Sequence, residues 1–345
     1  MKNIVECVPN FSEGRNPETI DALASTIRGV EGVKLLGVEP DKDYHRTVVT
    51  FVGEPASVLE AAYQSTRVAV ERIDMSLHKG EHPRLGAVDV VPFVPVSGVS
   101  MDDCVRLAHE YGKRVSHDFK IPVYLYEHAA TKPERSNLST IRKGEYEGLA
   151  QKLKDAAWKP DYGAAEFNVR SGGTVTGARK FLIAYNVNLN TADSTLAQEI
   201  ALRIRESGRL KKDASGQTMK DQRGEAIKIP GTLKAVKAMG VFLQRFNIAQ
   251  VSINLVDYEA TPPHIAFEEV RRQARSLGFE ATGSEIVGLA PLTALLVGGT
   301  FYAHRDAKAS DLNEEELLSI AIRELGLSRL EAFDPKKKII EYMIS

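Results

Sequence analysis

The chain has 345 residues, which is long for one hydrophobic core and comfortable for two. Its hydrophobic content of 43% and charged content of 26% are ordinary for a globular protein in water. A net charge of −1 argues against a broad nucleic-acid or anionic-membrane surface, so we expect neither partner. Cys7 and Cys104 give no disulfide framework or ligand spacing. With no apolar run near ~20 residues and no signal peptide, we expect a cytoplasmic protein.

Hydrophobic patterning in the first 130 residues predicts strands that alternate with amphipathic helices. Pro17 suits the first turn of a helix, and Ser100 begins another with Asp102 and Asp103 near its positive end. In chain order the pattern is β-α-β-β-α-β with an added α-β, which is the ferredoxin-like arrangement. The predicted strands are residues 4–9, 33–38, 47–52, 87–96 and 121–126, and the predicted helices are residues 17–28, 56–73 and 99–116.

The second half repeats this order of elements after an irregular segment at residues 131–177, in which only 141–157 favours a helix. So long an irregular segment is often a binding loop. A Lys/Gly/Asp-rich loop at 208–230 is expected to be mobile and not itself a site. We predict an α/β (α+β) protein of two ferredoxin-like β-α-β-β-α-β subdomains, with a ligand cleft between them. The later predicted strands are 181–189, 233–243, 249–258 and 280–287, and the helices are 192–206, 262–277, 291–296 and 314–325.

A short loop between the second helix and the fourth strand is dense in titratable side chains, namely His78, Lys79, Glu81, His82 and Arg84. Groups so close together perturb one another's pKa values, as catalytic groups do. One histidine could act as a general acid/base near neutral pH, with Glu81 and the cations setting its charge. A solvated polar turn is the alternative interpretation.

The same loop spells H-x-x-E-H, a zinc-hydrolase signature built on His78 and His82. That signature requires a helix, so that both imidazoles lie on one face. Gly80 and Pro83 interrupt a helix here, so we predict no metal site.

Three other positions have side chains suited to a ligand. Arg46, at the entrance of a strand, suits a bidentate grip on a carboxylate, although a surface ion pair is the alternative. Asn10 could bind a ligand or simply make its turn. Asn254 would line the cleft only if its strand end points toward the first subdomain.

The glycine-rich residues 172–179 lack the Lys and spacing of a phosphate loop, so we expect no nucleotide site.

Several blocks of the sequence resemble the formiminotransferase family, in the same order and across nearly the whole chain: residues 5–14, 50–53, 74–76, 78–84, 176–182 and 250–254. The resemblance implies a one-carbon transferase of histidine degradation, which moves the formimino group of N-formimino-L-glutamate to N5 of tetrahydrofolate. It also implies an N-terminal formiminotransferase subdomain at 1–180, a C-terminal one at 181–331 and a tail at 332–345. A folate site in the groove between the subdomains and a homodimer are further implications.

The resemblance also implies roles for single residues. His82 matches the catalytic histidine of the family, and the folate-binding loop is matched by Asp161, Gly163, Phe167, Gly172 and Gly177. Residues 164–166 and 168–171 depart from the family pattern, and His45 stands where we expect Asn, directly before Arg46. The remaining candidates for substrate and folate contacts are Asn10, Arg46, Arg84 and Asn254, with the two arginines expected to hold substrate carboxylates.

Other functions compete with this expectation. A folate-binding protein without transferase activity is one, and a formyl transferase or 5-formyltetrahydrofolate cyclo-ligase is another, although the ligase would need ATP. A zinc hydrolase is a third. The expected co-substrate is tetrahydrofolate, in mono- or polyglutamylated form. In some animals the family's transferase is fused to a cyclodeaminase, a half that we do not find in this sequence, so a separate cyclodeaminase is a candidate partner.

Overall fold

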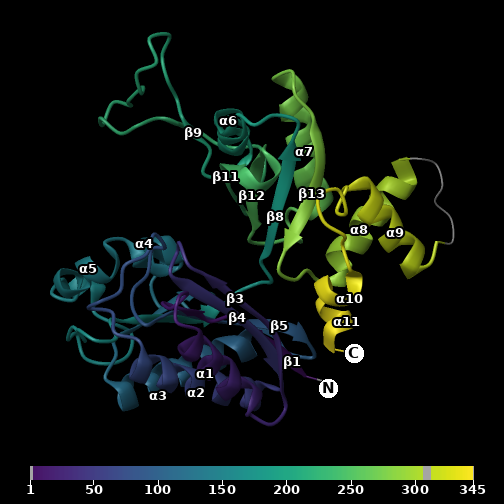
Figure 1. Ribbon diagram of the computed structural model, residues 1–345. Coiled ribbons are helices and arrows are strands. Elements are labelled where there is room, and N and C mark those ends of the chain that lie inside the picture. The colour runs from purple at the N-terminus through teal and green to yellow at the C-terminus, as the bar shows by residue number, and fades with distance from the viewer. Residues whose placement is uncertain (1–2, 306–311, 345) are drawn as a thin grey trace. The chain divides into compact units, whose positions relative to one another are not determined.

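The protein divides into two compact units, Met1–Lys180 and Phe181–Ser345, which we call the N-terminal and C-terminal units. Figure 1 shows the computed structural model, in which residues 3–305 and 312–344 are described. Both units combine a β-sheet with helices. None of the described helices is long and apolar enough to cross a membrane.

The sheet of the N-terminal unit has a ferredoxin-like centre in which β1 lies between β4 and β5, and β3 pairs with the far side of β4. All these pairs are antiparallel, which confirms the predicted order β-α-β-β-α-β. Two more strands, β7 and β6, extend the sheet in parallel beyond β5. The strands are β1 (Ile4–Cys7), β2 (Asn10–Phe11), β3 (Val33–Asp41), β4 (Arg46–Gly53), β5 (Val88–Ser97), β6 (Val123–Glu127) and β7 (Thr174–Ala178).

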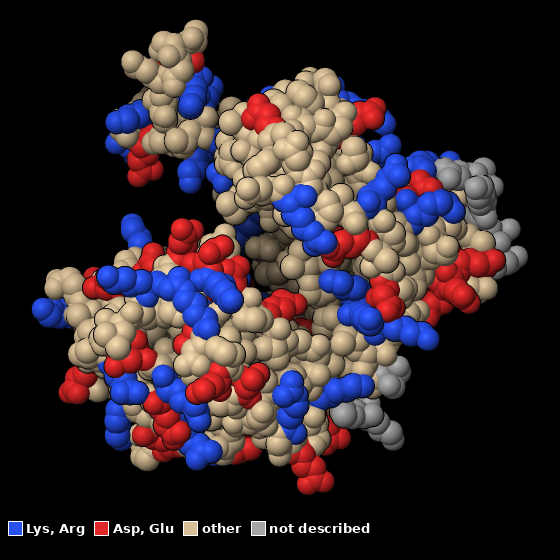
Figure 2. Space-filling view, viewed as in Figure 1, with Lys and Arg blue, Asp and Glu red and all other residues tan. Residues whose placement is uncertain are grey.

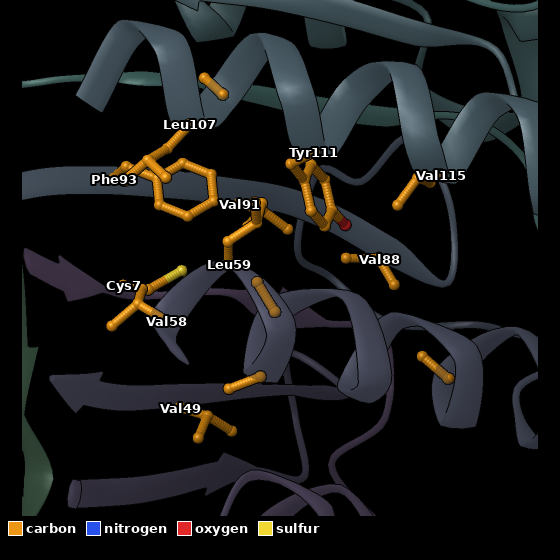
Figure 3. Close-up of a cluster of buried hydrophobic side chains, with 14 of the residues drawn as sticks. Cys7, Val49, Val58, Leu59, Val88, Val91, Phe93, Leu107, Tyr111 and Val115 are labelled. Carbon is orange, nitrogen blue, oxygen red and sulfur yellow. The ribbon is translucent and has the colours of Figure 1, made fainter. Parts of the chain in front are cut away.

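Three long helices pack on one face of this sheet: α1 (Pro17–Arg28), α2 (Pro55–Arg72) and α3 (Met101–Phe119). Ser100 caps α3 in a capping box with Asp103, as the sequence predicts. Alternate strand residues and helix residues meet in one buried cluster, and Figure 3 shows part of it: Cys7, Val49, Val91 and Phe93 from strands, with Val58, Leu59, Leu107 and Tyr111 from helices. Each large apolar side chain buried here contributes about 1.5–3 kcal/mol, so the cluster anchors the strands whose ends carry the polar residues.

The segment expected to be irregular, residues 131–177, is more ordered than the sequence predicts. It contains the short helices α4 (Leu138–Arg142) and α5 (Glu145–Lys152), two 3₁₀ turns (Pro133–Arg135 and Ala156–Trp158), and β7. The single helix expected at 141–157 is wrong because Gly144 and Glu145 have positive φ angles of 88° and 55° and break it. A second apolar cluster, including Ile141 and Leu149, packs around this segment.

The C-terminal unit repeats the ferredoxin-like order, which confirms the prediction for the second half. Its antiparallel sheet has the order β11-β12-β8-β13, with α6 packed on β11 and β12 and α7 on β13 and β8. The bounds are β8 (Ile183–Leu189), α6 (Ser194–Ile204), β11 (Val236–Leu243), a 3₁₀ turn (Gln244–Phe246), β12 (Ile248–Leu255), α7 (Pro263–Ser276), β13 (Ala281–Val287), α8 (Leu292–Arg305), α9 (Glu314–Glu324), α10 (Pro335–Lys338) and α11 (Ile340–Ile344).

The Lys/Gly/Asp-rich segment, expected to be a mobile loop, forms a projecting arm that starts and ends in a hairpin of β9 (Arg209–Leu210) and β10 (Lys228–Ile229) (Figure 1). Beyond the hairpin, residues 212–219 (KDASGQTM) and 220–227 (KDQRGEAI) repeat one eight-residue pattern. In each copy one aspartate oxygen accepts two backbone N–H groups, with N···O distances of 2.8–3.0 Å, so each copy folds as its own Asp-centred turn.

Three backbone hydrogen bonds join these two turns to the base of the arm. The N–H of Lys211 donates to the Ile227 carbonyl, that of Ile227 to Met219, and that of Met219 back to Lys211, at N···O distances of 2.8–2.9 Å. The turns are therefore two lobes of one closed ring of hydrogen bonds. Figure 2 shows that lysine and arginine side chains cluster on the arm.

A buried carboxyl group in the centre of the N-terminal sheet makes a testable prediction about stability. Glu6 on β1 lies opposite Val52 and Val94 and is 3% exposed. Burial raises its pKa to about 7, although the Arg179 guanidinium opposes the rise. The folded state then binds the proton more tightly than the unfolded state, so stability is lost as pH rises from about 4.5 to 7.

We therefore expect Glu6→Gln to stabilise the protein at pH 8 by about 3 kcal/mol, and by little at pH 4.5, since each pKa unit corresponds to about 1.4 kcal/mol. Thermal unfolding midpoints at the two pH values measure this difference. Glu39→Gln, at an exposed position of β3, is the control and should show no such pH-dependent gain. Equal destabilisation by Glu6→Gln at both pH values would contradict the raised pKa assigned to Glu6.

Candidate active site

The loop between α2 and β5 is held against the turn between β3 and β4. The rings of His78 and His45 stack with centroids 4.2 Å apart and planes 12° from parallel. His78 Nε2 lies 2.9 Å from the His45 carbonyl oxygen, and His45 Nδ1 lies 3.0 Å from that of Lys79. A Cβ at Gly80 would lie 2.5 Å from the Tyr44 carbonyl oxygen, so only glycine permits this approach. We call this arrangement the loop clasp.

Arg84 fixes the other end of the loop. It is 5% exposed, its Nε donates to His78 Nδ1 over 3.2 Å, and its terminal nitrogens contact Glu145 and Glu147 at 2.6–2.9 Å. Burial lowers the pKa of Arg84, but the two carboxylates outweigh burial and raise it overall. Because both carboxylates already pair with Arg84, this guanidinium is a structural anchor that a substrate carboxylate would have to compete for. These groups line a cavity of about 470 Å³.

Two further arginines lie near the loop. Arg142 at the end of α4 forms an ion pair with Asp89, which is 1% exposed and also accepts the Leu85 N–H at 3.0 Å. Arg46 begins β4, and its Nε is buried without a hydrogen-bond partner among the described residues. Burial lowers the pKa of Arg46, and Arg142 acts in the same direction. Arg46 is thus a half-buried cation whose Nε donor has no partner in the described part of the chain, which suits an anionic ligand.

His82 is half-buried beside this group of cations, with its ring edge-on to Tyr44 at a centroid distance of 6.3 Å. Burial lowers its pKa to about 3, and the charges of Arg46, Arg142 and Arg84 and the His78 ring add to the effect. The imidazole is therefore neutral at physiological pH and can accept a proton.

The residues matched to a folate-binding loop hold the backbone of the N-terminal unit. Asp161 accepts the Leu125 N–H at 2.9 Å and contacts Arg135 at 3.4 Å. Gly163 has a φ of +85°, and a Cβ there would lie 2.9 Å from a backbone oxygen. Phe167 is half-buried against the Tyr146 ring at 5.3 Å.

Two more glycines of that stretch are equally confined. At Gly172, with a φ of +67°, a Cβ would lie 2.4 Å from the Leu85 carbonyl oxygen, and at Gly177 on β7 it would lie 2.3 Å from that of Tyr126. Gly172 therefore presses directly on the residue that follows Arg84. These glycines let the backbone of 172–177 pack against the His82 loop and β6.

The last two candidates lie elsewhere. Asn10, on β2, donates to the Val8 carbonyl at 3.2 Å, the local turn contact that was the alternative interpretation. Asn254 is exposed on β12 of the C-terminal unit, opposite Lys237 and Ala184.

Sequence reasoning did not single out several groups that shape the site, namely Glu13, Asp89, Arg142, Glu145 and Glu147. Asp89 carried a signal: it is the only acidic residue in the apolar run 87–96, and a buried carboxylate needs a cationic partner. Nothing in the local sequence identified Arg142 as that partner, because 53 residues separate the two.

The His-x-x-Glu-His residues do not form the helix that a zinc signature requires, since α2 ends at Arg72 and the loop up to Val88 is not helical. Among residues 3–305 and 312–344, no group of three or more His, Cys, Asp and Glu side chains is placed to hold a metal ion.

The N-terminal unit matches the family described as "Formiminotransferase domain, N-terminal subdomain" over residues 4–179, and the C-terminal unit matches "Formiminotransferase domain" over residues 184–345. The chain belongs to the formiminotransferase family. Its fold and both halves of its sequence agree with the resemblance drawn from the blocks around His82.

Named relatives of two kinds align with the chain. It is 42% identical to a glutamate formimidoyltransferase of Streptococcus pyogenes serotype M1 over 88% of this chain and 94% of the relative. It is 43% identical to a glutamate formimidoyltransferase of Thermoplasma acidophilum over 87% of this chain and 92% of the relative. It is 48% identical to the formimidoyltransferase-cyclodeaminase of Mus musculus over all of this chain but only 60% of the relative, so it spans three-fifths of that larger protein.

The close packing at Gly172 predicts that a larger side chain there lowers the stability of the fold, whether or not Gly172 contacts a ligand. We expect Gly172→Ala to destabilise the N-terminal unit by about 2 kcal/mol or more, because the new Cβ meets the Leu85 carbonyl and the backbone is left-handed. Gly148→Ala in α5 is the control: a Cβ there meets nothing within 4 Å, and alanine favours a helix by about 1 kcal/mol. Denaturant unfolding measures both. A Gly172→Ala protein as stable as the wild type would rule out the tight packing.

Proposed function

We propose that this protein transfers the formimino group from N-formimino-L-glutamate to N5 of tetrahydrofolate, with His82 as general base and then general acid. The observation that carries the proposal is a neutral imidazole set among three arginines, one of which has a buried, unsatisfied donor. A substrate carboxylate fits the free Nε donor of Arg46, and the transfer requires a group that moves a proton. The glutamate formimidoyltransferases among its relatives support the choice of reaction.

In the proposed reaction, N5 of tetrahydrofolate attacks the amidine carbon and forms a new carbon–nitrogen bond. The tetrahedral adduct carries a proton on N5, which the neutral His82 imidazole accepts. The resulting imidazolium donates that proton to the glutamate nitrogen, the bond between this nitrogen and the transferred carbon breaks, and glutamate leaves. Proton transfer of this kind contributes typically 10²–10⁴-fold, and the positioning of both substrates supplies more.

The surrounding arginines explain how one imidazole serves both steps. In the free protein burial lowers the pKa of His82 to about 3 and their charges add to this effect, so the imidazole is neutral but weakly basic. A substrate carboxylate bound at Arg46 would cancel part of this positive field and raise the pKa of His82 toward the working pH. Substrate binding would thus prepare the base for its task.

We further propose tetrahydrofolate as co-substrate, with residues 161–177 as the folate-binding stretch and Phe167 as its stacking side chain. Asn10 and Asn254 are proposed ligand contacts of the two units. We also propose a homodimer, as the family resemblance implies, that works in the cytoplasm without a metal. The net charge of −1 favours neither a membrane nor a nucleic-acid partner. A cyclodeaminase is the proposed consumer of the product, since the Mus musculus relative unites both names in one chain.

The direct test is a steady-state assay of 5-formimino-tetrahydrofolate formation by absorbance, with and without a chelator. We expect chelator-insensitive turnover that falls about 10²–10⁴-fold in His82→Ala. His117→Ala, at a side chain 80% exposed on α3, is the control and should retain full turnover. Near-full turnover in His82→Ala would exclude the acid/base role, and folate binding without turnover would favour a binding protein.

Arg46→Gln tests the carboxylate site and the electrostatic coupling together. We expect KM for formiminoglutamate to rise about tenfold or more, since charge-assisted hydrogen bonds contribute about 1.5–3 kcal/mol. Loss of the Arg46 charge should also raise the pKa of His82 in the free protein, which imidazole NMR titration measures. The exposed Arg67 on α2 is the matched control, and Arg67→Gln should change neither quantity. An unchanged KM and an unchanged His82 titration would argue against both roles.

A further inference from the structure

The contacts of His45 specify where its protons lie. Its Nδ1 is 3.0 Å from the Lys79 carbonyl oxygen, which only accepts hydrogen bonds, so Nδ1 carries a proton. Its Nε2 is 3.1 Å from Glu13 Oε1, which already accepts the N–H groups of Arg15 and Asn16 at 2.8 and 2.9 Å. A neutral ring protonated on Nδ1 would direct its Nε2 lone pair at this carboxylate. The geometry is satisfied only when Nε2 is protonated as well.

The contacts of His78 specify the opposite state. Its Nδ1 accepts from Arg84 Nε, which can only donate, and its Nε2 lies 2.9 Å from the His45 carbonyl oxygen. His78 is therefore neutral with its proton on Nε2. Burial lowers the pKa of His78, in agreement with this assignment. An imidazolium thus stacks on a neutral imidazole at 4.2 Å, an arrangement in which the positive ring is attracted to the π face of its neighbour.

We propose that His45 is a positioning residue: the proton that it holds against Glu13 keeps the loop clasp closed and thereby fixes His82 and Arg46 for the transfer reaction. This inference rests on the proposed function of His82. His45 immediately precedes Arg46, and its ring is bonded to Lys79, three residues before His82. A change at one ring therefore reaches both proposed functional side chains through the backbone.

The groups around His45 decide when it loses this proton. Glu13, from the turn after β2, favours the imidazolium. Tyr44 and Arg46 flank it in the turn, and His78 and Lys79 face it from the loop, with Arg84 beyond His78. The pKa of Glu13 is below its ordinary value: burial opposes this shift, but the N–H groups of Asn16 and Arg15 and the His45 ring outweigh burial. The Glu13 carboxylate therefore remains charged as the pH falls. The ion pair between Glu13 and His45 is lost only at alkaline pH, when His45 gives up its proton.

Loss of the proton removes the ion pair and leaves a lone pair facing a carboxylate. His45 also has a left-handed backbone, with φ at +50°, which a non-glycine residue adopts only when its contacts compensate. Without the pair with Glu13, the ring should rotate and release its bond to Lys79. The expected result is a reversible loss of turnover at alkaline pH while the protein remains folded.

The first test reads the protons directly, by ¹⁵N NMR of histidine-labelled protein across pH 5–10, with resonances assigned from His45→Asn and His78→Asn. We expect both ring nitrogens of His45 to carry a proton at pH 7, as their two acceptors require, and we expect Glu13→Gln to lose one of these protons at a lower pH because the charged acceptor is gone. We expect His78 to be a neutral Nε2–H tautomer. A neutral His45 at pH 7, or a midpoint insensitive to Glu13→Gln, would overturn the proposal.

The second test is the pH dependence of kcat with saturating substrates. In the wild type we expect kcat to fall by about tenfold over the pH unit above the His45 midpoint. His45→Asn preserves the left-handed turn, because asparagine tolerates this conformation, but it has no proton to hold against Glu13. We therefore expect its kcat to be lowered at neutral pH and to show no such alkaline fall. Glu13→Gln should move the fall to lower pH by the same interval as the NMR midpoint. An alkaline fall unchanged in His45→Asn would refute the positioning role.

These two tests separate this inference from the proposed function. If the protein does not transfer the formimino group, the NMR experiment still decides whether the His45 proton exists. If it does transfer the group, only the pH profiles of the two variants decide whether that proton positions His82.

Discussion

The stacked imidazoles of His45 and His78 are the contact on which the geometry of the site depends. The sheet of the N-terminal unit fixes the turn that carries His45, and the stack transmits this position to a loop that has no regular structure of its own. Arg84 holds the far end of the loop through two carboxylates of α5. A loop fixed at both ends has little conformational entropy left to lose, so His82 is preorganised for the role proposed for it.

The second constraint is electrostatic. Placing Arg46 and Arg142 near His82 destabilises positive charge, and the protein relieves only part of this cost through the ion pair of Arg142 with Asp89. Arg46 keeps an unsatisfied buried donor. A fully paired site would be more stable, but it would offer nothing to an anionic ligand. Within the described residues, leaving the Arg46 Nε donor unsatisfied therefore lowers stability locally, as binding sites commonly do.

The sequence predicted the two ferredoxin-like units because their strands and helices have clear hydrophobic periods. It also singled out the loop at 78–84 as a candidate site, because its titratable residues are adjacent in the chain. It could not place Arg142 or Glu147, since their partners Asp89 and Arg84 lie more than 50 residues away and only the folded sheet brings them together. Likewise, the single helix expected at 141–157 was wrong, because the positive φ at Gly144 that divides it depends on tertiary packing rather than on the hydrophobic pattern of the sequence.

The projecting arm of the C-terminal unit has a consequence for how this protein can evolve. Its two lobes, residues 212–219 and 220–227, close on themselves through their own aspartates and meet only in a ring of backbone hydrogen bonds. An in-frame loss of one octapeptide would leave the other lobe and the pairing of Leu210 with Lys228 intact. The arm can therefore gain or lose one octapeptide, which changes the size of its charged surface and leaves the buried core of the C-terminal unit untouched.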